Sequence, residues 1–239
     1  MNRFVKWALL ALPVILGGAA IVAVVGYFDL RQSLPQTEGT AELPALSAAV
    51  EVSRDDHGIP TIRAESMADA YTALGYLHAQ DRLWQMDFMR RTAEGRLSEV
   101  AGQGTLGLDR FMRILDLGDL AKAQVQHLDA RTRSALEAYA AGVNAFLDTD
   151  PVLPLEFHIL DYEPEAWTPQ DSLTWLRLMA MQLSGNYRSE LTRAALSQRL
   201  DAAQMRFLYP DSGADQATTL ADAATGRALG RMERQLADL

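Results

Sequence analysis

The sequence predicts a mostly α-helical α+β fold with one short β-hairpin near its N-terminus. Apolar residues recur at helical spacing over three long stretches, 66–91, 109–148 and 169–184. Strand-like alternation is confined to a short region, 49–63, which also contains a Gly-centred turn. Hydrophobic residues make up 49% and charged residues 22% of the 239-residue chain. These values are typical of a globular protein and are compatible with one sizeable domain.

Charge and cysteine content exclude several classes of function. The chain carries 22 basic and 31 acidic residues, for a net charge of −9. A nucleic-acid surface needs a clustered basic patch, which this composition argues against. The absence of cysteine rules out a disulfide framework and a thiolate metal site within this chain.

The N-terminal segment, 1–28, is predicted to be a membrane anchor. No charged residue lies between Trp7 and Phe28, and Arg3 and Lys6 precede this run. Such a run is long enough to cross a bilayer, which takes about 20 residues as a helix, and the early positive charges favour a cytoplasmic N-terminus. The alternatives are a cleaved signal peptide and a buried core helix. Anchor and signal peptide both place the rest of the chain in the periplasm, after a Pro- and Gly-containing linker at 29–46.

The hairpin and the first helix follow from local signals. Residues 49–53 alternate as a strand, Asp55–Gly58 forms a turn, and 61–63 can pair back as a second strand. Ser66 is a predicted helix N-cap. Polar residues then interrupt the apolar stripe of the helix, and burying such groups is costly unless they are hydrogen-bonded. We therefore expect a structural polar network, rather than a catalytic one, with members among His78, Gln80, Asp81, Arg82 and Gln85.

Further helices are predicted downstream. Residues 97–101 form a short helix that ends at Gly102, and 109–148 forms two helices that separate near Leu128-Asp129. A proline-rich loop at 148–169 leads to a helix capped by Thr168, which has so little polar face that we expect it to be buried. Arg177 within it must find a partner or reach water. Another helix starts near Ser189. The predicted domain covers 47–210, and 211–239 is a tail without aromatic residues.

Several motifs in the first half of the chain occur together in a fixed order. They are His57-Gly58-Ile59-Pro60, Gly75-Tyr76, Ala79-Gln80-Asp81-Arg82-Leu83-Trp84-Gln85-Met86-Asp87, Arg90-Arg91, Gly95-Arg96 and Glu99-Val100-Ala101-Gly102. This series resembles the α chain of the penicillin acylase family, and the resemblance covers roughly residues 50 to 200. Members of that family are N-terminal-nucleophile (Ntn) hydrolases with an αββα fold, which cleave the amide bond of N-acylated small molecules. The tail at 211–239 resembles the spacer that follows the α chain in the family's precursor.

The resemblance also implies site residues. A glutamate just after the break that follows the long helix supplies one calcium ligand in the family, and Glu190 falls on that position. The alternative is a helix-start glutamate stabilised by the helix dipole. A calcium site takes six to eight oxygens, so the other ligands are expected from the β chain. Met179 and Leu183 match the family's acyl-pocket wall only in part, because Gln182-Leu183 replaces an Arg-Phe pair. Ordinary core packing is the alternative for both.

No catalytic residue is expected in this chain. The family's nucleophile is an N-terminal serine freed by autocatalytic cleavage of the precursor (the zymogen), usually followed by asparagine, and no Ser-Asn pair occurs here. The predicted function is therefore the α segment of a hydrolase for N-acylated small molecules, of the penicillin, cephalosporin or acyl-homoserine-lactone type. Its catalytic serine would lie in a β chain, and this segment alone would be inactive. The alternative is a non-catalytic, membrane-anchored helical module that binds a partner.

Overall fold

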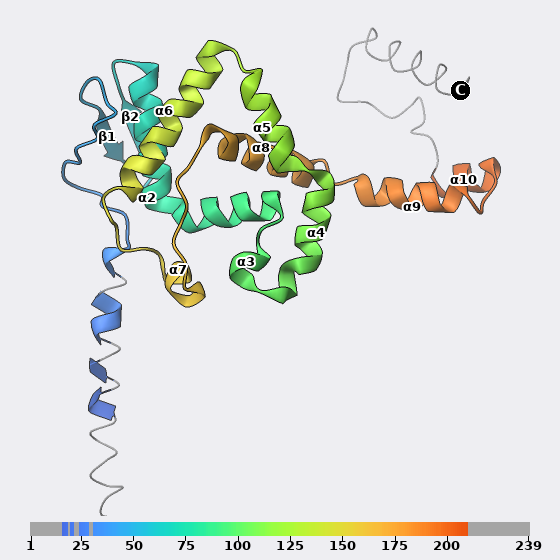
Figure 1. Ribbon diagram of the computed structural model, residues 1–239, viewed down its shortest axis with the longest axis horizontal. Coiled ribbons are helices and arrows are strands. Elements are labelled where there is room, and N and C mark those ends of the chain that lie inside the picture. The colour runs from blue at the N-terminus through green and yellow to red at the C-terminus, as the bar shows by residue number, and fades with distance from the viewer. Residues whose placement is uncertain (1–15, 19, 22–23, 29–30, 210–239) are drawn as a thin grey trace, which may run out of the picture. The chain divides into compact units, whose positions relative to one another are not determined.

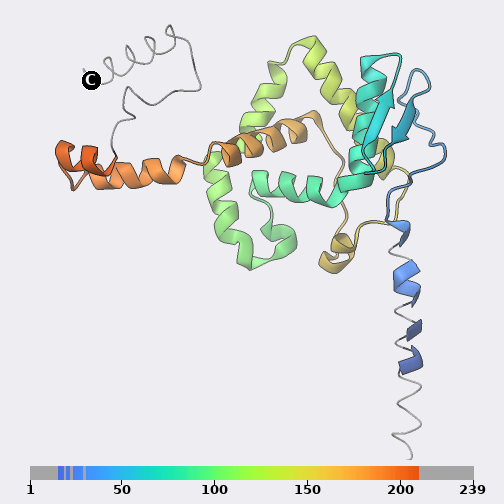
Figure 2. The same ribbon diagram turned by 180° about the vertical axis from the view of Figure 1, so that it is seen from behind.

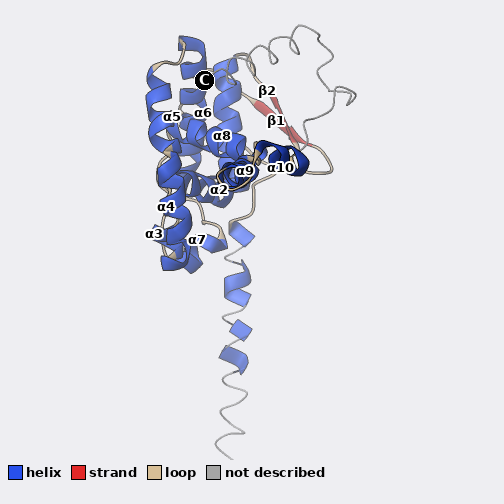
Figure 3. Ribbon diagram, turned by 90° about the vertical axis from the view of Figure 1, so that its right-hand side faces the viewer, coloured by secondary structure: helices blue, strands red, loops and turns tan. Residues whose placement is uncertain are grey.

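In the computed structural model, the described residues are 16–18, 20–21, 24–28 and 31–209. They belong to two units, divided after Leu183. The first unit contains β1 (Glu51–Arg54), β2 (Pro60–Arg63), α2 (Met67–Glu94), α3 (Ser98–Ala101), the 3-10 helix η1 (Gln103–Thr105), α4 (Leu106–Leu115), α5 (Leu117–Gln126), α6 (Ala130–Leu147), α7 (Leu155–Leu160) and α8 (Pro169–Leu183) (Figure 1). The second contains α9 (Tyr187–Ser197) and α10 (Ala202–Leu208). Among the described residues, helices dominate and the strands are confined to one antiparallel pair, which confirms the predicted fold class (Figure 3).

The predicted hairpin is present. Strands β1 and β2 pair antiparallel, with Glu51 opposite Arg63 and Arg54 opposite Pro60. Asp55 Oδ1 accepts hydrogen bonds from the turn amides, including that of Ile59 at 2.8 Å. Gly58 has a φ of 76°, which a residue without Cβ adopts at little cost. The hairpin lies against the N-terminal half of α2 (Figure 2).

Part of the expected polar network fastens this hairpin to α2. Arg54 Nη1 and Nη2 each donate to the carboxylate of Asp81 at 2.9 Å, and Nη2 also contacts Gln80 Oε1 at 3.3 Å. The network is therefore confirmed for Gln80 and Asp81, and it is structural. Arg82 and Gln85 are exposed and take no part in these hydrogen bonds.

Helix α2 begins after Ser66, as predicted, but it ends at Glu94 rather than at residue 91, and it is bent in the middle. Ser66 Oγ accepts from the amide of Asp69 at 3.0 Å, and Gly95 ends the helix in the left-handed conformation with a φ of 64°. Arg82 has a non-helical backbone, with a φ of −144° and a ψ of 23°. The bend directs the first half of α2 along α6 and turns the second half toward α4 and α8 (Figure 1).

Two glycines allow α2 and α6 to cross closely. A Cβ built on Gly75 would lie 2.1 Å from the carbonyl oxygen of Tyr139, and one on Gly142 would lie 1.9 Å from that of Thr72. Both distances are far shorter than any tolerated contact. The backbones themselves are therefore in van der Waals contact at this crossing, and any side chain would force the helices apart.

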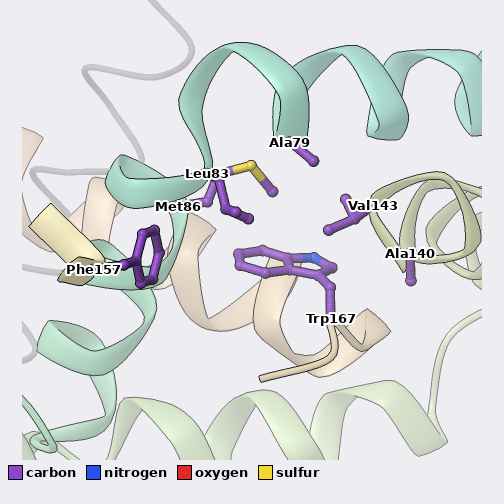
Figure 4. Close-up of a cluster of buried hydrophobic side chains, with 7 residues drawn as sticks. All are labelled: Ala79, Leu83, Met86, Ala140, Val143, Phe157 and Trp167. Atoms are coloured by element: carbon purple, nitrogen blue, oxygen red, sulfur yellow. The ribbon is translucent and has the colours of Figure 1, made fainter. Parts of the chain in front are cut away.

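Trp167 stands at the centre of the main hydrophobic cluster (Figure 4). Its indole lies between side chains from the bend of α2 and those of α6, with Phe157 of α7 at the edge of the cluster. The buried members are Ala79, Leu83, Met86, Ala140, Val143, Phe157 and Trp167. Asn144 of α6 holds the backbone of Trp167 from both sides, accepting from its amide at 2.7 Å and donating to its carbonyl at 2.9 Å. Packing and hydrogen bonds together fix the loop before α8.

Three helix predictions were wrong in detail. The stretch before Leu128 is two helices rather than one, because Asp116 adopts the left-handed conformation, with a φ of 56°, and ends α4. Helix α7 lies inside the segment predicted as a loop. Helix α8 is not fully buried among the described residues, since Leu176 is 57% exposed. Arg177 finds a partner as required, donating from Nη2 to Gln124 Oε1 of α5 at 2.8 Å.

Asp109 of α4 closes the turn that follows α2. It is 2% exposed, and its carboxylate accepts from the amides of Leu97 at 3.0 Å and Ser98 at 2.7 Å. Burial acts to raise the pKa of Asp109, but the hydrogen bonds from Ser98 and Leu97 outweigh it, so the pKa lies below its ordinary value of 3.8.

This pKa predicts an acid-sensitive contribution to stability. Because the folded pKa is lower than the unfolded value of 3.8, the contribution is complete above that value and is lost as the pH falls through the folded pKa. We expect the free energy of unfolding of Asp109→Asn, measured with urea between about pH 6 and about pH 2, to depend less on pH than that of the wild type. Equal slopes below pH 4 would contradict this assignment.

The predicted anchor at 7–28 and the tail at 211–239 lie largely or wholly outside the described residues. Among the residues that are described, no helix is long and apolar enough to cross a membrane. The predicted domain, 47–210, spans the boundary between the two units. The anchor, linker and tail therefore stay predictions.

Candidate functional site

An apolar groove lies between α2, α6 and the start of α8. Its volume is about 890 Å³, within the range of roughly 300–1,000 Å³ that is usual for binding pockets. Most of its wall is aliphatic or aromatic. The residues that line it are Met67, Ala68, Tyr71, Leu74, His78, Arg82, Gln85, Met86, Arg131, Thr132, Ser134, Ala135, Leu136, Tyr139, Trp167, Ser172 and Trp175.

The base of the groove is held rigidly. Trp167 is only 5% exposed, and its indole Nε1 donates to Ser172 Oγ at 2.9 Å. Helices α2 and α6, which form two of the walls, are locked at the Gly75 and Gly142 crossing. The groove is thus a preformed feature of the described fold and needs no rearrangement to open.

His78 and Tyr139 form a second polar contact within the groove. His78 Nδ1 and the Tyr139 hydroxyl are 3.1 Å apart, and the two rings meet edge to face. Burial lowers the pKa of His78, although the charge of Asp81 partly opposes this, and burial raises the pKa of Tyr139 to about 12. Both groups are therefore neutral at pH 7. Within the described chain, the side-chain hydrogen bond of His78 goes to Tyr139 and to no serine or threonine. The expectation that His78 is structural agrees with this geometry.

A second polar feature is a cluster of buried charges at the C-terminal half of α2. Asp87, which is 1% exposed, accepts from Arg90 Nη2, from Arg91 Nε at 2.8 Å and from the Tyr162 hydroxyl at 2.8 Å. Burial and the neighbouring Asp87 carboxylate raise the pKa of Tyr162, which keeps it a hydrogen-bond donor. Arg90 also donates to the carbonyl of Ala166 at 3.0 Å.

The cluster continues outward to the surface. Arg91 Nη1 reaches Glu99 at 3.0 Å, and Glu165 accepts from both Arg91 and Arg96. These contacts join α2, α3 and the loop before α8 into one block. They contain no pairing of nucleophile and base, so we assign the cluster a structural role.

The residues predicted as pocket walls lie on α8, outside the groove. Met179 is partly buried and Leu183 is 80% exposed. They are four residues apart and so share a face of the helix. Their role in an acyl pocket stays a prediction. The sequence reasoning did not identify the groove, because its walls come from helices that are distant in sequence.

Glu190 lies in the first turn of α9 and is exposed. Among the described residues, no group of three or more His, Cys, Asp or Glu side chains is placed to hold a metal ion. A single carboxylate suits a hard cation by residue type but cannot complete a site of six to eight oxygens. The role of Glu190 as one calcium ligand therefore stays a prediction.

Comparison with known proteins identifies the family. Residues 49–229 match the family described as penicillin amidase, so the chain belongs to that family. It is 40% identical over 187 residues to the penicillin acylase 2 proenzyme of Pseudomonas sp. (strain SE83), covering 78% of this chain and 24% of that protein. It is 38% identical over 183 residues to the acyl-homoserine lactone acylase QuiP of Pseudomonas aeruginosa, covering 75% of this chain and 22% of the relative.

The fold has a counterpart among solved structures. A thermostable penicillin G acylase from Alcaligenes faecalis superposes with a TM-score of 0.56 and 29% sequence identity, covering 73% of this chain and 96% of the solved chain. The resemblance inferred from the motifs is thereby confirmed. The chain spans only about a quarter of the length of the curated relatives, yet nearly all of the matched solved chain.

Proposed function

We propose that this chain is the helical α segment of a hydrolase that cleaves the amide bond of N-acylated small molecules. The observation that carries the proposal is the match to nearly the whole of one solved penicillin G acylase chain, together with a relative 40% identical that is named a penicillin acylase. Another relative is named an acyl-homoserine lactone acylase. Removal of an acyl group from a nitrogen is the chemistry that these names share.

In this proposal the catalytic serine lies in a β chain outside this sequence. The described residues supply a rigid helical frame, in which the buried charges of the Asp87 cluster are paired within the fold. In the groove, the neutral His78 is hydrogen-bonded to Tyr139 and not to a nucleophile. In the family chemistry, the serine's own α-amino group acts as base and N–H donors stabilise the oxyanion. This chain would position those groups and would be inactive by itself.

Three finer features belong to the same proposal. Met179 and Leu183 would form part of the acyl pocket, with an aliphatic character suited to a fatty-acyl substrate. Glu190 would supply one calcium ligand, with the others from the β chain. Residues 7–28 would anchor the protein to the inner membrane, with the remainder in the periplasm. The apolar sequence of 7–28 and the position of Glu190 after the α8 break support these assignments.

A segment exchange tests the proposal. In the penicillin acylase 2 proenzyme of Pseudomonas sp. (strain SE83), the segment that matches this chain is replaced by the corresponding residues of this chain. We expect the exchanged protein to be processed and to hydrolyse a chromogenic N-acyl amide, while this chain alone gives only background turnover. The unaltered proenzyme is the positive control. A folded exchanged protein, verified by circular dichroism, that neither matures nor turns over substrate would contradict the proposal.

A further inference from the structure

The groove between α2, α6 and α8 presents apolar surface that the described chain leaves uncovered. Met67 at its rim is 61% exposed, and Trp175 and Leu136 form part of its wall. Apolar and aromatic side chains gathered around a preformed depression mark a binding surface more often than an accident of packing. Because hydrogen bonds already fix Trp167 at the base of the groove, binding of an occupant would not carry the entropy cost of ordering this part of the wall.

The charges of the groove differ in sign from those of the chain. The chain has a net charge of −9, but the lining contains Arg82, Arg131 and no aspartate or glutamate. The arginines near α2 that serve the fold are all ion-paired within it, namely Arg54, Arg90, Arg91 and Arg96. Within the described ranges, the exposed Arg82 and Arg131 form no ion pair. An occupant that carries a carboxylate would complement them.

The lengths of the matched proteins indicate what the occupant is. This chain covers 96% of the matched chain in the penicillin G acylase structure but only 19% of the curated penicillin G acylase of Escherichia coli. The counterpart in the solved structure is therefore a short chain of its own, and most of the acylase lies in a companion chain. A second copy of this chain is a poorer fit, because pairing two copies through this groove would bring Arg82 and Arg131 of both into one interface, and neither lining supplies a carboxylate.

We propose that this groove is the docking site for a segment of the companion chain that presents a carboxylate beside an aliphatic or aromatic side chain. The proposal rests on the proposed function, because it takes the companion to be the β chain of the same hydrolase. The apolar side chain fills the groove above Trp167, and the carboxylate pairs with Arg131 at the first turn of α6.

Photo-crosslinking in the active exchanged protein tests the location. A benzoylphenylalanine is placed at Ser134, an exposed groove residue on α6, and in a matched variant at Arg110, an exposed residue of α4 outside the groove. We expect the companion chain to be captured from position 134 and captured weakly or not at all from position 110. Capture from 134 of a second copy of this chain, or no capture, overturns the proposal.

Charge reversal tests the chemistry. Glutamate at position 131 lies in the first turn of α6, where the helix dipole favours a negative charge, so Arg131→Glu should leave the helix intact. We expect it to raise the dissociation constant of the two chains by about tenfold or more, while Arg131→Lys and the control Arg110→Glu change it less than about threefold. Equal effects of Arg131→Glu and Arg110→Glu overturn the proposal.

The outcomes separate this proposal from the one on which it rests. An exchanged protein without amide hydrolysis would refute the proposed function, and the groove assignment with it. An active protein in which position 134 captures nothing and Arg131→Glu binds normally would refute the groove assignment alone. Saturable binding of a fluorescent fatty acid to the complete two-chain protein, abolished by Arg131→Glu, would identify a small-molecule groove and also refute the docking role.

Discussion

Replacing Asp87 with alanine should destabilise the chain by about 3–5 kcal/mol, the range observed when one partner of a buried ion pair is removed. Asp87 is 1% exposed, and its carboxylate is shared by the buried guanidinium groups of Arg90 and Arg91 and by the hydroxyl of Tyr162. Its loss would leave two positive charges buried without this counter-ion. Urea unfolding, monitored by far-UV circular dichroism at pH 7, measures the change.

The matched control for Asp87→Ala is a substitution in a solvent-exposed ion pair. Glu51 and Arg63 pair across the hairpin at 3.6 Å, and both side chains are 69% exposed. Because exposed pairs contribute about 0–1 kcal/mol, Glu51→Ala should change the free energy of unfolding little. If Asp87→Ala were no more destabilising than Glu51→Ala, the cluster would not hold α2 to the loop before α8, and the structural role assigned to it would be wrong.

Gly142→Ala is the second change expected to have a large effect, with a loss of about 3 kcal/mol, near the upper end for overpacking. The added Cβ would lie 1.9 Å from the Thr72 carbonyl oxygen and 2.9 Å from the Tyr76 amide nitrogen. These are backbone atoms of α2, which cannot turn aside as a flexible side chain can. The helices must separate, which would loosen the packing around Trp167. Thermal or urea unfolding of the variant measures the loss.

Gly107→Ala provides the comparison for Gly142→Ala. Gly107 also lies in a helix, α4, but its added Cβ would meet no atom within 4 Å. Alanine has a better helix propensity than glycine, so Gly107→Ala should be neutral or stabilise the chain by up to about 1 kcal/mol. Similar destabilisation by both substitutions would show that the close α2–α6 crossing is not the cause of the loss at position 142.

The elements that the sequence predicted correctly are those fixed by neighbouring residues. Ser66 caps α2 because its hydroxyl reaches an amide three residues away, and the Asp55–Gly58 turn sets the hairpin. The break at Asp116 was missed because an aspartate in the left-handed conformation has no strong local signal. The bend at Arg82 could not be predicted either, because no proline or glycine lies next to it in the sequence.

The candidate site was less predictable for the same reason. Asp81 was recognised as a polar residue on an apolar stripe, but its partner Arg54 lies 27 residues earlier. Asp87 and Tyr162 are 75 residues apart, and the groove draws its walls from α2, α6 and α8. The glycines of the α2–α6 crossing were visible in the sequence, but nothing local shows that Gly75 and Gly142 face each other's helix. Sequence motifs gave the family, while the tertiary fold gives the surface by which the chain can meet a partner.

The most direct test of the central claim is where a serine-directed covalent inhibitor attaches in the active exchanged protein. Phenylmethylsulfonyl fluoride and peptide mass spectrometry give the answer in one measurement. If this chain has a structural role and the catalytic serine belongs to another polypeptide, the sulfonyl group will be found on the N-terminal serine of the companion chain. This chain alone will then neither be labelled nor hydrolyse the amide. Labelling of a serine within this chain, accompanied by loss of turnover, would contradict the account.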